Sequence, residues 1–338
     1  MRLAPVCLGL LATVARAQTC APAEAAAKAL DRGDVAAAES LLAPFETAAP
    51  PCDEILLDLA RLRVAQKQFR AAESLFVQYV QRAPQDARGP LEFARFLFSM
   101  SEYPRADVMA QRAVSLAPSN AQALTLAGQL LVMKGETAQG QSLLEKACKI
   151  DPANATAHFQ LGALMDRAKR PAEAAAEFEK VIALQPANPR AYDYLALNLE
   201  PLGEIERAQQ AYQKALQIND GPQFDSFLDY NYGRFLMKRN RLSESKKHLD
   251  RAVELAPKVR AVRYERGKLN FRLGNYAEAR NDGERALSLK DPGGVIIDLQ
   301  IYNLLQLIYT RLGETELARQ YAELSRTTPV PLRSESPR

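Results

Sequence analysis

The sequence has few of the residues that perform catalysis or hold metal ions. Its 338 residues include only two histidines, His158 and His248, and four cysteines. The motifs CxxC, HExxH, GxSxG, GxGxxG and the phosphate-binding loop are all missing after residue 17. Two histidines are too few for a metal cluster or a catalytic site. We therefore expect no catalytic residue, no metal site, no cofactor and no enzymatic activity.

Long apolar runs are also scarce. After residue 17, no segment approaches the roughly 18 apolar residues that are needed to cross a bilayer, so no membrane span is expected. The one apolar run, residues 3–14, follows Arg2 and leads to Ala15-Arg16-Ala17, where small residues suit a signal peptidase. We predict a signal peptide over residues 1–17; the alternative is the frayed end of a first helix. An exported chain would be periplasmic if its source is bacterial, and otherwise secreted.

The chain has no dense run of charge of one sign, although its two parts differ in net charge. Residues 18–225 contain 21 basic and 26 acidic residues, a net of −5, and residues 226–338 contain 21 and 14, a net of +7. This asymmetry can steer a charged partner toward the C-terminal half. A nucleic-acid-binding protein needs a denser basic stripe, so no nucleic acid partner is expected.

A regular repeat is what the sequence does have. Pro50, Pro84, Pro118, Pro152 and Pro186 recur every 34 residues, a period that suits two helices and two turns. Aligning these prolines at position 32 divides a predicted domain, residues 18–326, into consecutive units. The units are 19–52, 53–86, 87–120, 121–154, 155–188, 189–222, 226–259, 260–293 and 299–332. Residues 327–338 are rich in Pro, Ser, Thr and Arg and are predicted to form a disordered tail.

Four columns of this alignment predict how the helices pack. Small residues let two backbones approach closely, and large residues fill the space that remains. Position 8 holds Ala26, Ala60, Ala94, Gly128, Gly162, Ala196, Gly233 and Gly267, and position 20 holds Ala38, Ala72, Ala106, Gly140, Ala174, Ala208, Ser245, Ala279 and Ala318. Position 24 holds Leu42, Phe76, Leu144, Phe178, Tyr212 and Leu249, and position 11 holds Leu97, Leu131, Met165, Leu199, Leu236 and Tyr309.

Glycine recurs between the two helices of a unit. It stands at Gly33, Gly135, Gly203, Gly274 and Gly313, often with an acidic residue directly after it. Glycine suits the left-handed end of a helix, and an acidic residue suits the start of the next one. Each unit is therefore predicted to be a helical hairpin.

These columns resemble the tetratricopeptide repeat, and the resemblance covers essentially the whole chain after residue 17. It implies an all-α, right-handed superhelical solenoid of about nine helix pairs that binds proteins or peptides. Several positions depart from the family pattern: Asp229 and Arg263 replace its large aromatic at position 4, and Gly283 and Gln306 interrupt other columns. These departures put the packing of single units in doubt. A related solenoid of helix pairs is the alternative.

In the resembling family, the first helix of each pair lines a concave face through positions 2, 5, 6, 9, 12 and 13. Early repeats place short or apolar residues there, such as Ala23, Ala27 and Leu91, whereas later repeats place Tyr, Arg and Asn. The predicted partner-binding residues are Arg190, Tyr194, Tyr230, Asn231, Arg234, Tyr264, Lys268, Arg272 and Asn303. The alternative is that they are ordinary exposed residues of amphipathic helices.

The first repeat has a cysteine near each end. Cys20 and Cys52 occupy positions 2 and 34, on the same edge of the solenoid, and an exported protein meets oxidising surroundings. We predict a Cys20–Cys52 disulfide; the alternative is two free thiols. Such a loop could stabilise the fold by roughly 3–4 kcal/mol.

Taken together, the sequence predicts an exported, non-catalytic scaffold that binds an extended peptide or partner protein in a concave groove. If the source is bacterial, the family resemblance implies a role in assembling envelope or secretion machinery. The alternative is an accessory or regulatory subunit that recruits an enzyme of surface-glycan or envelope biogenesis. The partner's identity and the oligomeric state are left open.

Overall fold

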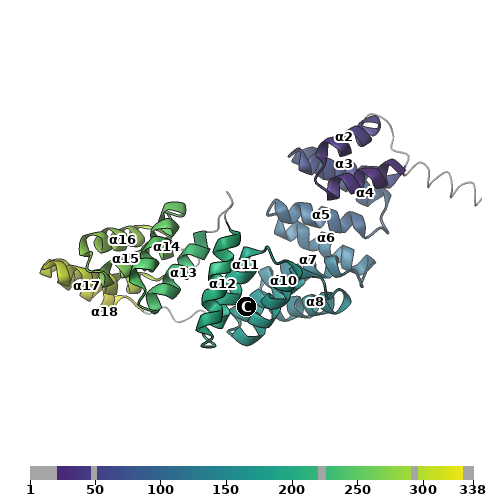
Figure 1. Cartoon of the computed structure of the whole chain (residues 1–338). Coiled ribbons are helices and arrows are strands. Elements are labelled where there is room, and N and C mark those ends of the chain that lie inside the picture. The colour runs from purple at the N-terminus through teal and green to yellow at the C-terminus, as the bar shows by residue number, and fades with distance from the viewer. Residues whose placement is uncertain (1–20, 47–51, 220–225, 291–295, 330–338) are drawn as a thin grey trace, which may run out of the picture. The chain divides into compact units, whose positions relative to one another are not determined.

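The computed structural model describes residues 21–46, 52–219, 226–290 and 296–329, and every regular element in these residues is a helix (Figure 1). The chain forms two compact units, Met1–Ala157 and His158–Arg338, which are called unit 1 and unit 2 below. The predicted signal peptide, Cys20 and residues 330–338 of the predicted tail lie outside the described residues. Cys52 is buried and precedes a helix, and the predicted disulfide stays a prediction.

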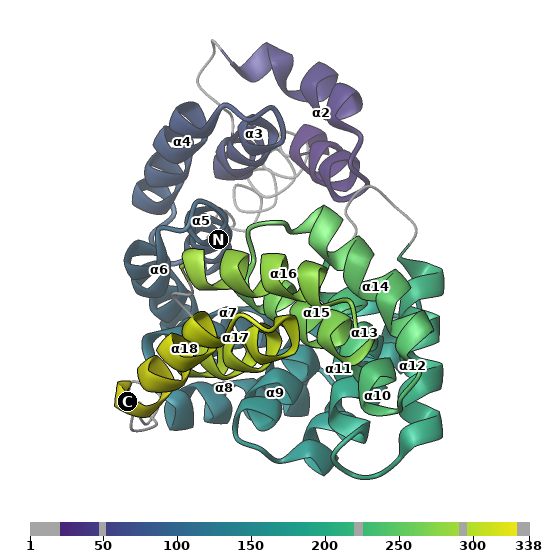
Figure 2. The same cartoon turned by 90° about the vertical axis from the view of Figure 1, so that its left-hand side faces the viewer.

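Unit 1 is built from consecutive helix pairs whose members lie side by side in both views (Figures 1 and 2). Its helices are residues 21–31, α2 (Val35–Leu42), the short 3-10 helix η1 (Ala43–Phe45), α3 (Asp53–Ala65), α4 (Phe69–Arg82), α5 (Arg88–Ser99), α6 (Tyr103–Leu116), α7 (Ala121–Lys134) and α8 (Thr137–Ile150).

Unit 2 repeats the same arrangement. Its helices are α9 (Ala155–Arg167, which begins at the end of unit 1), α10 (Pro171–Leu184), α11 (Pro189–Leu199), α12 (Ile205–Ile218), α13 (Ser226–Lys238), α14 (Leu242–Leu255), α15 (Arg260–Arg272), α16 (Tyr276–Ser288), α17 (Asp298–Leu312) and α18 (Thr315–Thr327). The first helices α11, α13, α15 and α17 also contact one another in succession, so they form one layer. Nine helix pairs in the described residues confirm the predicted all-α solenoid.

Every turn between paired helices in the described residues contains one residue with a left-handed backbone. These residues, with φ between 60° and 94°, are Gly33, Lys67, Ser101, Gly135, Lys169, Gly203, Asn240, Gly274 and Gly313. The backbone N–H of the residue after the left-handed one donates a hydrogen bond to the preceding helix. For example, the N–H of Glu136 donates to the carbonyl oxygen of Leu131 at 2.9 Å. The predicted glycine turns are confirmed, and four other turns hold a side chain in the same conformation.

The small-residue columns lie where the two helices of a pair meet. A Cβ atom on Gly140 would lie 2.7 Å from the backbone oxygen of Gly128, which is closer than a real carbon atom can approach. The large residues of position 24, such as Phe76, Phe178 and Tyr212, are almost completely buried beside them. Gly283 breaks that column because Leu305 of α17 occupies the space that its side chain would fill.

Positions 4 and 23 of a repeat face each other across its two helices. In three repeats of unit 2 they form polar pairs that are 19 residues apart: His158 with Glu177 (2.6 Å), Asp229 with His248 (2.7 Å) and Arg263 with Asp282 (3.1 Å). In two repeats of unit 1 the same two positions hold leucine pairs, Leu56 with Leu75 and Leu124 with Leu143, within apolar clusters. The residues that depart from the family's aromatic at position 4 are thus matched by a complementary residue at position 23.

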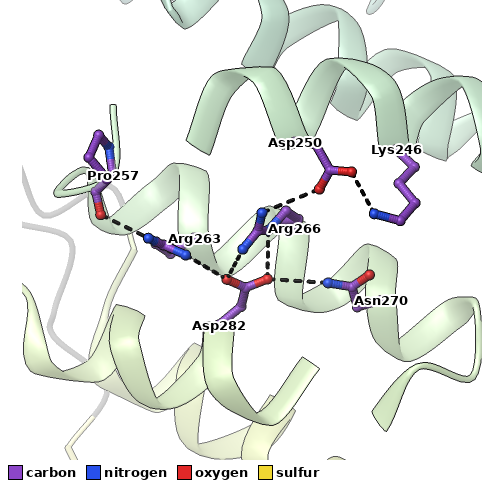
Figure 3. Close-up of polar contacts among 7 residues, drawn as sticks. All are labelled: Lys246, Asp250, Pro257, Arg263, Arg266, Asn270 and Asp282. Carbon is purple, nitrogen blue, oxygen red and sulfur yellow. Dashed lines mark hydrogen bonds and ion pairs between the residues drawn. The ribbon is translucent and has the colours of Figure 1, made fainter. Parts of the chain in front are cut away.

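The eighth repeat extends this pairing into a buried polar network (Figure 3). Asp282 is 1% exposed and accepts two hydrogen bonds of 2.7 Å from the guanidinium of Arg266, one from Arg263 and one from the Asn270 amide. Arg266 also donates to Asp250 of α14 at 3.3 Å. Hydrogen bonds and charge pairing therefore link α14, α15 and α16 in addition to the apolar cluster that these helices share.

Candidate functional site

The nine predicted partner-binding residues all lie on the first helices of unit 2. Arg190 and Tyr194 are on α11, Tyr230, Asn231 and Arg234 on α13, Tyr264, Lys268 and Arg272 on α15, and Asn303 on α17. Because these helices contact one another in succession, the nine residues belong to one layer of the unit.

A buried carboxylate organises the centre of this layer. Glu265 of α15 is 5% exposed; its Oε2 lies 2.9 Å from Nζ of Lys268, and its Oε1 lies 3.8 Å from Nε of Arg234 on α13. The Arg234 guanidinium lies 5.2 Å from the ring centre of Tyr230, and the Lys268 ammonium 5.3 Å from that of Tyr264. Burial, together with the charge of Glu265, raises the pKa of Tyr264. We call these five residues the α13–α15 cluster.

Several of the nine residues are occupied by contacts within the protein. Asn231 is buried, and its amide nitrogen donates to both oxygens of the buried Asp193 at 3.2 and 3.0 Å. Arg272 donates to the backbone oxygen of Met237 at 2.7 Å and to the Asn240 side chain at 3.0 Å.

Two more of the nine also contact side chains of their own unit. Tyr194 stacks on Phe178 with ring centres 5.2 Å apart. Asn303 accepts a hydrogen bond of 2.6 Å from Ser325. Arg234 and Lys268 are partly exposed and Arg190 is exposed, so these three cations are accessible to an external partner.

A hollow in unit 2 lies beside the cluster. It has a volume of about 530 Å³ and includes only Arg234 of the nine predicted residues. Its lining is Asp166, Lys169, Pro171, Leu197, Asn198, Glu200, Pro201, Arg234, Lys238 and Arg239. Lys238 is held by Glu200 at 2.8 Å, and the guanidinium of Arg239 covers the ring of Phe235 at 4.7 Å. The lining of the hollow therefore includes four cations and two carboxylates.

Unit 1 contains a larger cavity, of about 840 Å³, that the residue types alone did not indicate. Its lining is Ala21, Ala23, Glu24, Ala27, Asp31, Glu54, Leu57, Asp58, Arg61, Arg88, Glu92, Arg95 and Gln122. These residues come from the first helices of the first four repeats: residues 21–31, α3, α5 and α7. We call it the unit 1 cavity. The early repeats thus present charged side chains as well as the predicted short and apolar ones.

A sequence signal for this cavity does exist. Glu24, Asp58 and Glu92 are spaced by 34 residues and form an acidic column, and Arg61 and Arg95 form a basic column with the same spacing. Burial raises the pKa of Asp58 to about 7, although the nearby Arg61 opposes the shift. Aligning charge by repeat position, instead of comparing residue types between repeats, would have found these columns.

The fold and these surfaces define a helical-repeat protein whose first helices present polar side chains. Sequence models of the tetratricopeptide repeat match residues 29–89 and 131–197, 230–294, and 189–221. The chain belongs to the tetratricopeptide repeat family. No curated protein sequence matches it at a significant level.

Solved structures with the same fold have low sequence identity to this chain. A tetratricopeptide repeat protein from Parabacteroides merdae is 16% identical, with 76% of this chain and 98% of that chain covered and a TM-score of 0.56. The pilF protein of Pseudomonas aeruginosa is 22% identical (61% and 90% covered, TM-score 0.53). The Cut9–Hcn1 hetero-tetramer of APC/C is 16% identical (86% and 58% covered, TM-score 0.57). None of the described helices is both long and apolar enough to span a bilayer.

Proposed function

We propose that this protein is a non-catalytic scaffold that binds an extended, carboxylate-bearing segment of a partner protein on the first helices of unit 2. The α13–α15 cluster carries the proposal. The side chains of Arg234 and Lys268 are 31% and 38% exposed, whereas the Glu265 side chain that holds both of them is 7% exposed. The cations therefore face a partner more than the anion does.

Preorganisation favours binding at this cluster. Each cation is oriented by an ion pair to Glu265 and by a tyrosine ring, so less side-chain entropy is lost when a partner carboxylate arrives. Arg and Tyr are also the residue types that contribute most binding energy at interfaces. The exposed Arg190 and Arg272 add positive charge on the same layer, which favours an acidic segment over a basic one.

The test selects ligands from a random peptide display library on the purified chain from residue 18 to residue 338. We expect the selected peptides to be rich in Asp and Glu. The double variant Arg234→Gln with Lys268→Gln should bind them about tenfold more weakly or worse, because two oriented charge contacts are removed.

The matched control, Lys247→Gln with Arg285→Gln, removes the same charge from the exposed surfaces of α14 and α16 and should bind like the unmodified protein. Replacing Asp and Glu by Asn and Gln in the peptides tests the same contacts without changing the protein. Selected peptides without acidic residues, or equal affinities for the double variant and its control, would rule out the proposed site.

We also propose that the chain is exported, to the periplasm if the source is bacterial, and acts there in assembling envelope or secretion machinery. The apolar run and the small residues before Gln18 support export. Intact-mass measurement of the protein recovered from its source, before and after reduction, should show a chain that begins at Gln18 and contains one disulfide, Cys20–Cys52. A mass that includes residues 1–17 would contradict export, and alkylation of Cys52 without prior reduction would contradict the disulfide.

A further inference from the structure

The unit 1 cavity has a regular arrangement of charge. Glu24, Asp58 and Glu92 come from three successive first helices, and all three line the cavity. Five carboxylates line it in total, against three guanidinium groups. Lys28, which does not line the cavity, pairs with Glu24 at 2.6 Å from the same helix. The lining therefore keeps an excess of negative charge.

The three arginines make their shortest contacts with carboxylates other than Asp58. Arg61 makes its close contact with Asp31, and Arg95 bonds Glu92 at 2.7 Å and Gln122 at 2.8 Å. Arg88 contacts Asp86 at 2.6 Å and Glu54 at 3.2 Å.

Asp58 is the poorly compensated member of the lining. It is 5% exposed, and its hydrogen bond to Arg61 is 3.5 Å long, at the limit of such a bond. A buried carboxylate with so little compensation is costly unless a further cation comes close. The raised pKa of Asp58 agrees with this geometry.

The dimensions of the cavity indicate what kind of cation would enter. A volume of about 840 Å³ is in the range that encloses an organic ligand or several side chains, far more than a single metal ion needs. The described residues hold no group of three His, Cys, Asp or Glu side chains suited to a metal ion. Leu57, Ala23 and Ala27 supply apolar walls that suit the methylene stem of a lysine or arginine.

We propose that the unit 1 cavity is a second recognition site, which binds an extended peptide segment by a basic side chain that reaches Asp58. The partner is a protein segment rich in lysine or arginine, opposite in charge to the segment proposed for unit 2. The two sites use different residues and different helices, so an experiment can disprove one proposal and leave the other standing.

The experiment uses short, end-blocked Gly/Ser peptides that carry three lysines, three arginines, three norleucines or three glutamates, labelled for fluorescence anisotropy. The lysine or arginine peptide should bind the full chain and the norleucine peptide should not, whereas any binding of the glutamate peptide should be lost in the Arg234→Gln with Lys268→Gln variant. Asp58→Asn keeps the side-chain volume, removes the charge and should weaken binding at least about tenfold. Asp107→Asn on α6, outside the cavity, makes the same chemical change and should leave binding unaltered.

Thermal unfolding of Asp58→Asn at pH 8 shows whether the variant is folded, and we expect it to be more stable than the unmodified protein. A variant that is stabilised and yet does not bind supports a ligand-binding role for Asp58. Equal binding by lysine and norleucine peptides, or full binding by Asp58→Asn, would overturn the proposal. The Arg234→Gln with Lys268→Gln variant should keep its affinity for the basic peptide, which separates this result from the test of unit 2.

Discussion

Individual residues of this protein show where local conformation or local charge costs stability. Asp58 and the four left-handed residues that are not glycine are the clearest cases. Such costs are tolerated where a turn shape or a binding site requires them. Each of them predicts a substitution that should stabilise the protein.

Asp58 should make stability depend on pH. Its pKa is about 7 in the folded protein and about 3.9 when unfolded, so the folded state keeps a proton that the unfolded state releases. The contribution of Asp58 to the free energy of unfolding is therefore fully present below pH 4. It is lost as the pH rises through 7, and the free energy of unfolding falls by about 2–4 kcal/mol. Chemical denaturation of Asp58→Asn between pH 4 and 8 should show a flatter profile than the unmodified protein. Parallel profiles for the two proteins would contradict the raised pKa.

Lys67 is in the left-handed conformation, at φ 60°, where five other turns have glycine. A side chain in this conformation is strained and glycine is not, so Lys67→Gly should raise the free energy of unfolding by up to about 1 kcal/mol. Lys67→Ala keeps a Cβ atom and should give no gain, which separates backbone strain from loss of the lysine charge. Equal stability of the two variants in urea denaturation would mean that the turn carries no strain.

At the scale of helices, the small-residue columns differ from one repeat to the next in how much room they leave. A Cβ on Gly140 would meet Val132 at 2.6 Å and the Gly128 oxygen at 2.7 Å, whereas a Cβ on Gly267 would meet nothing closer than 3.4 Å. Gly140→Ala should therefore cost about 2–3 kcal/mol through overpacking. Gly267→Ala should gain about 0.5–1 kcal/mol, because alanine favours the helix. Urea denaturation of both variants checks this order, and its reversal would contradict the packing described.

In the polar network of the eighth repeat, one carboxylate, Asp282, is bonded to three side chains of α15, and one of these, Arg266, also bonds Asp250 of α14 (Figure 3). Asp282→Ala would leave Arg263 and Arg266 partly buried without their main partner, which should cost about 3–5 kcal/mol. Glu73→Ala, which removes an exposed partner of the exposed Arg105, should cost less than about 1 kcal/mol. Denaturation of the two variants measures the difference. Similar losses would show that the network is no stronger than a surface ion pair.

At the scale of the whole molecule, the 34-residue period was enough to predict the fold. The prolines, the glycine turns and the alternation of small and large columns all depend on contacts within one repeat or between neighbouring repeats. Such contacts are local in sequence, so they leave a visible pattern. The large residue missing at Gly283 could not be explained from the sequence, because its replacement, Leu305, comes from the next repeat.

The candidate sites could be predicted only in part. Family register placed Arg234 and Lys268 on first helices of unit 2, where the structure has them, but it could not tell that Asn231 is bonded to Asp193, 38 residues away. The charge of each site also depends on which side chains neutralise one another, as Glu265 does for two cations. That choice is made by side-chain geometry, which residue types and spacing do not specify.

The polar side-chain pairs between positions 4 and 23 restrict how a chain of this kind can gain or lose length. Both members of a pair, such as His158 and Glu177, belong to the same 34-residue unit, so duplication or deletion of a complete unit keeps them together. A recombination event in the turn between the two helices would instead join His158 to the second helix of another unit, for example opposite a leucine like Leu143. Repeats should therefore have been duplicated or deleted as whole 34-residue units, with the recombination points between repeats and not inside them.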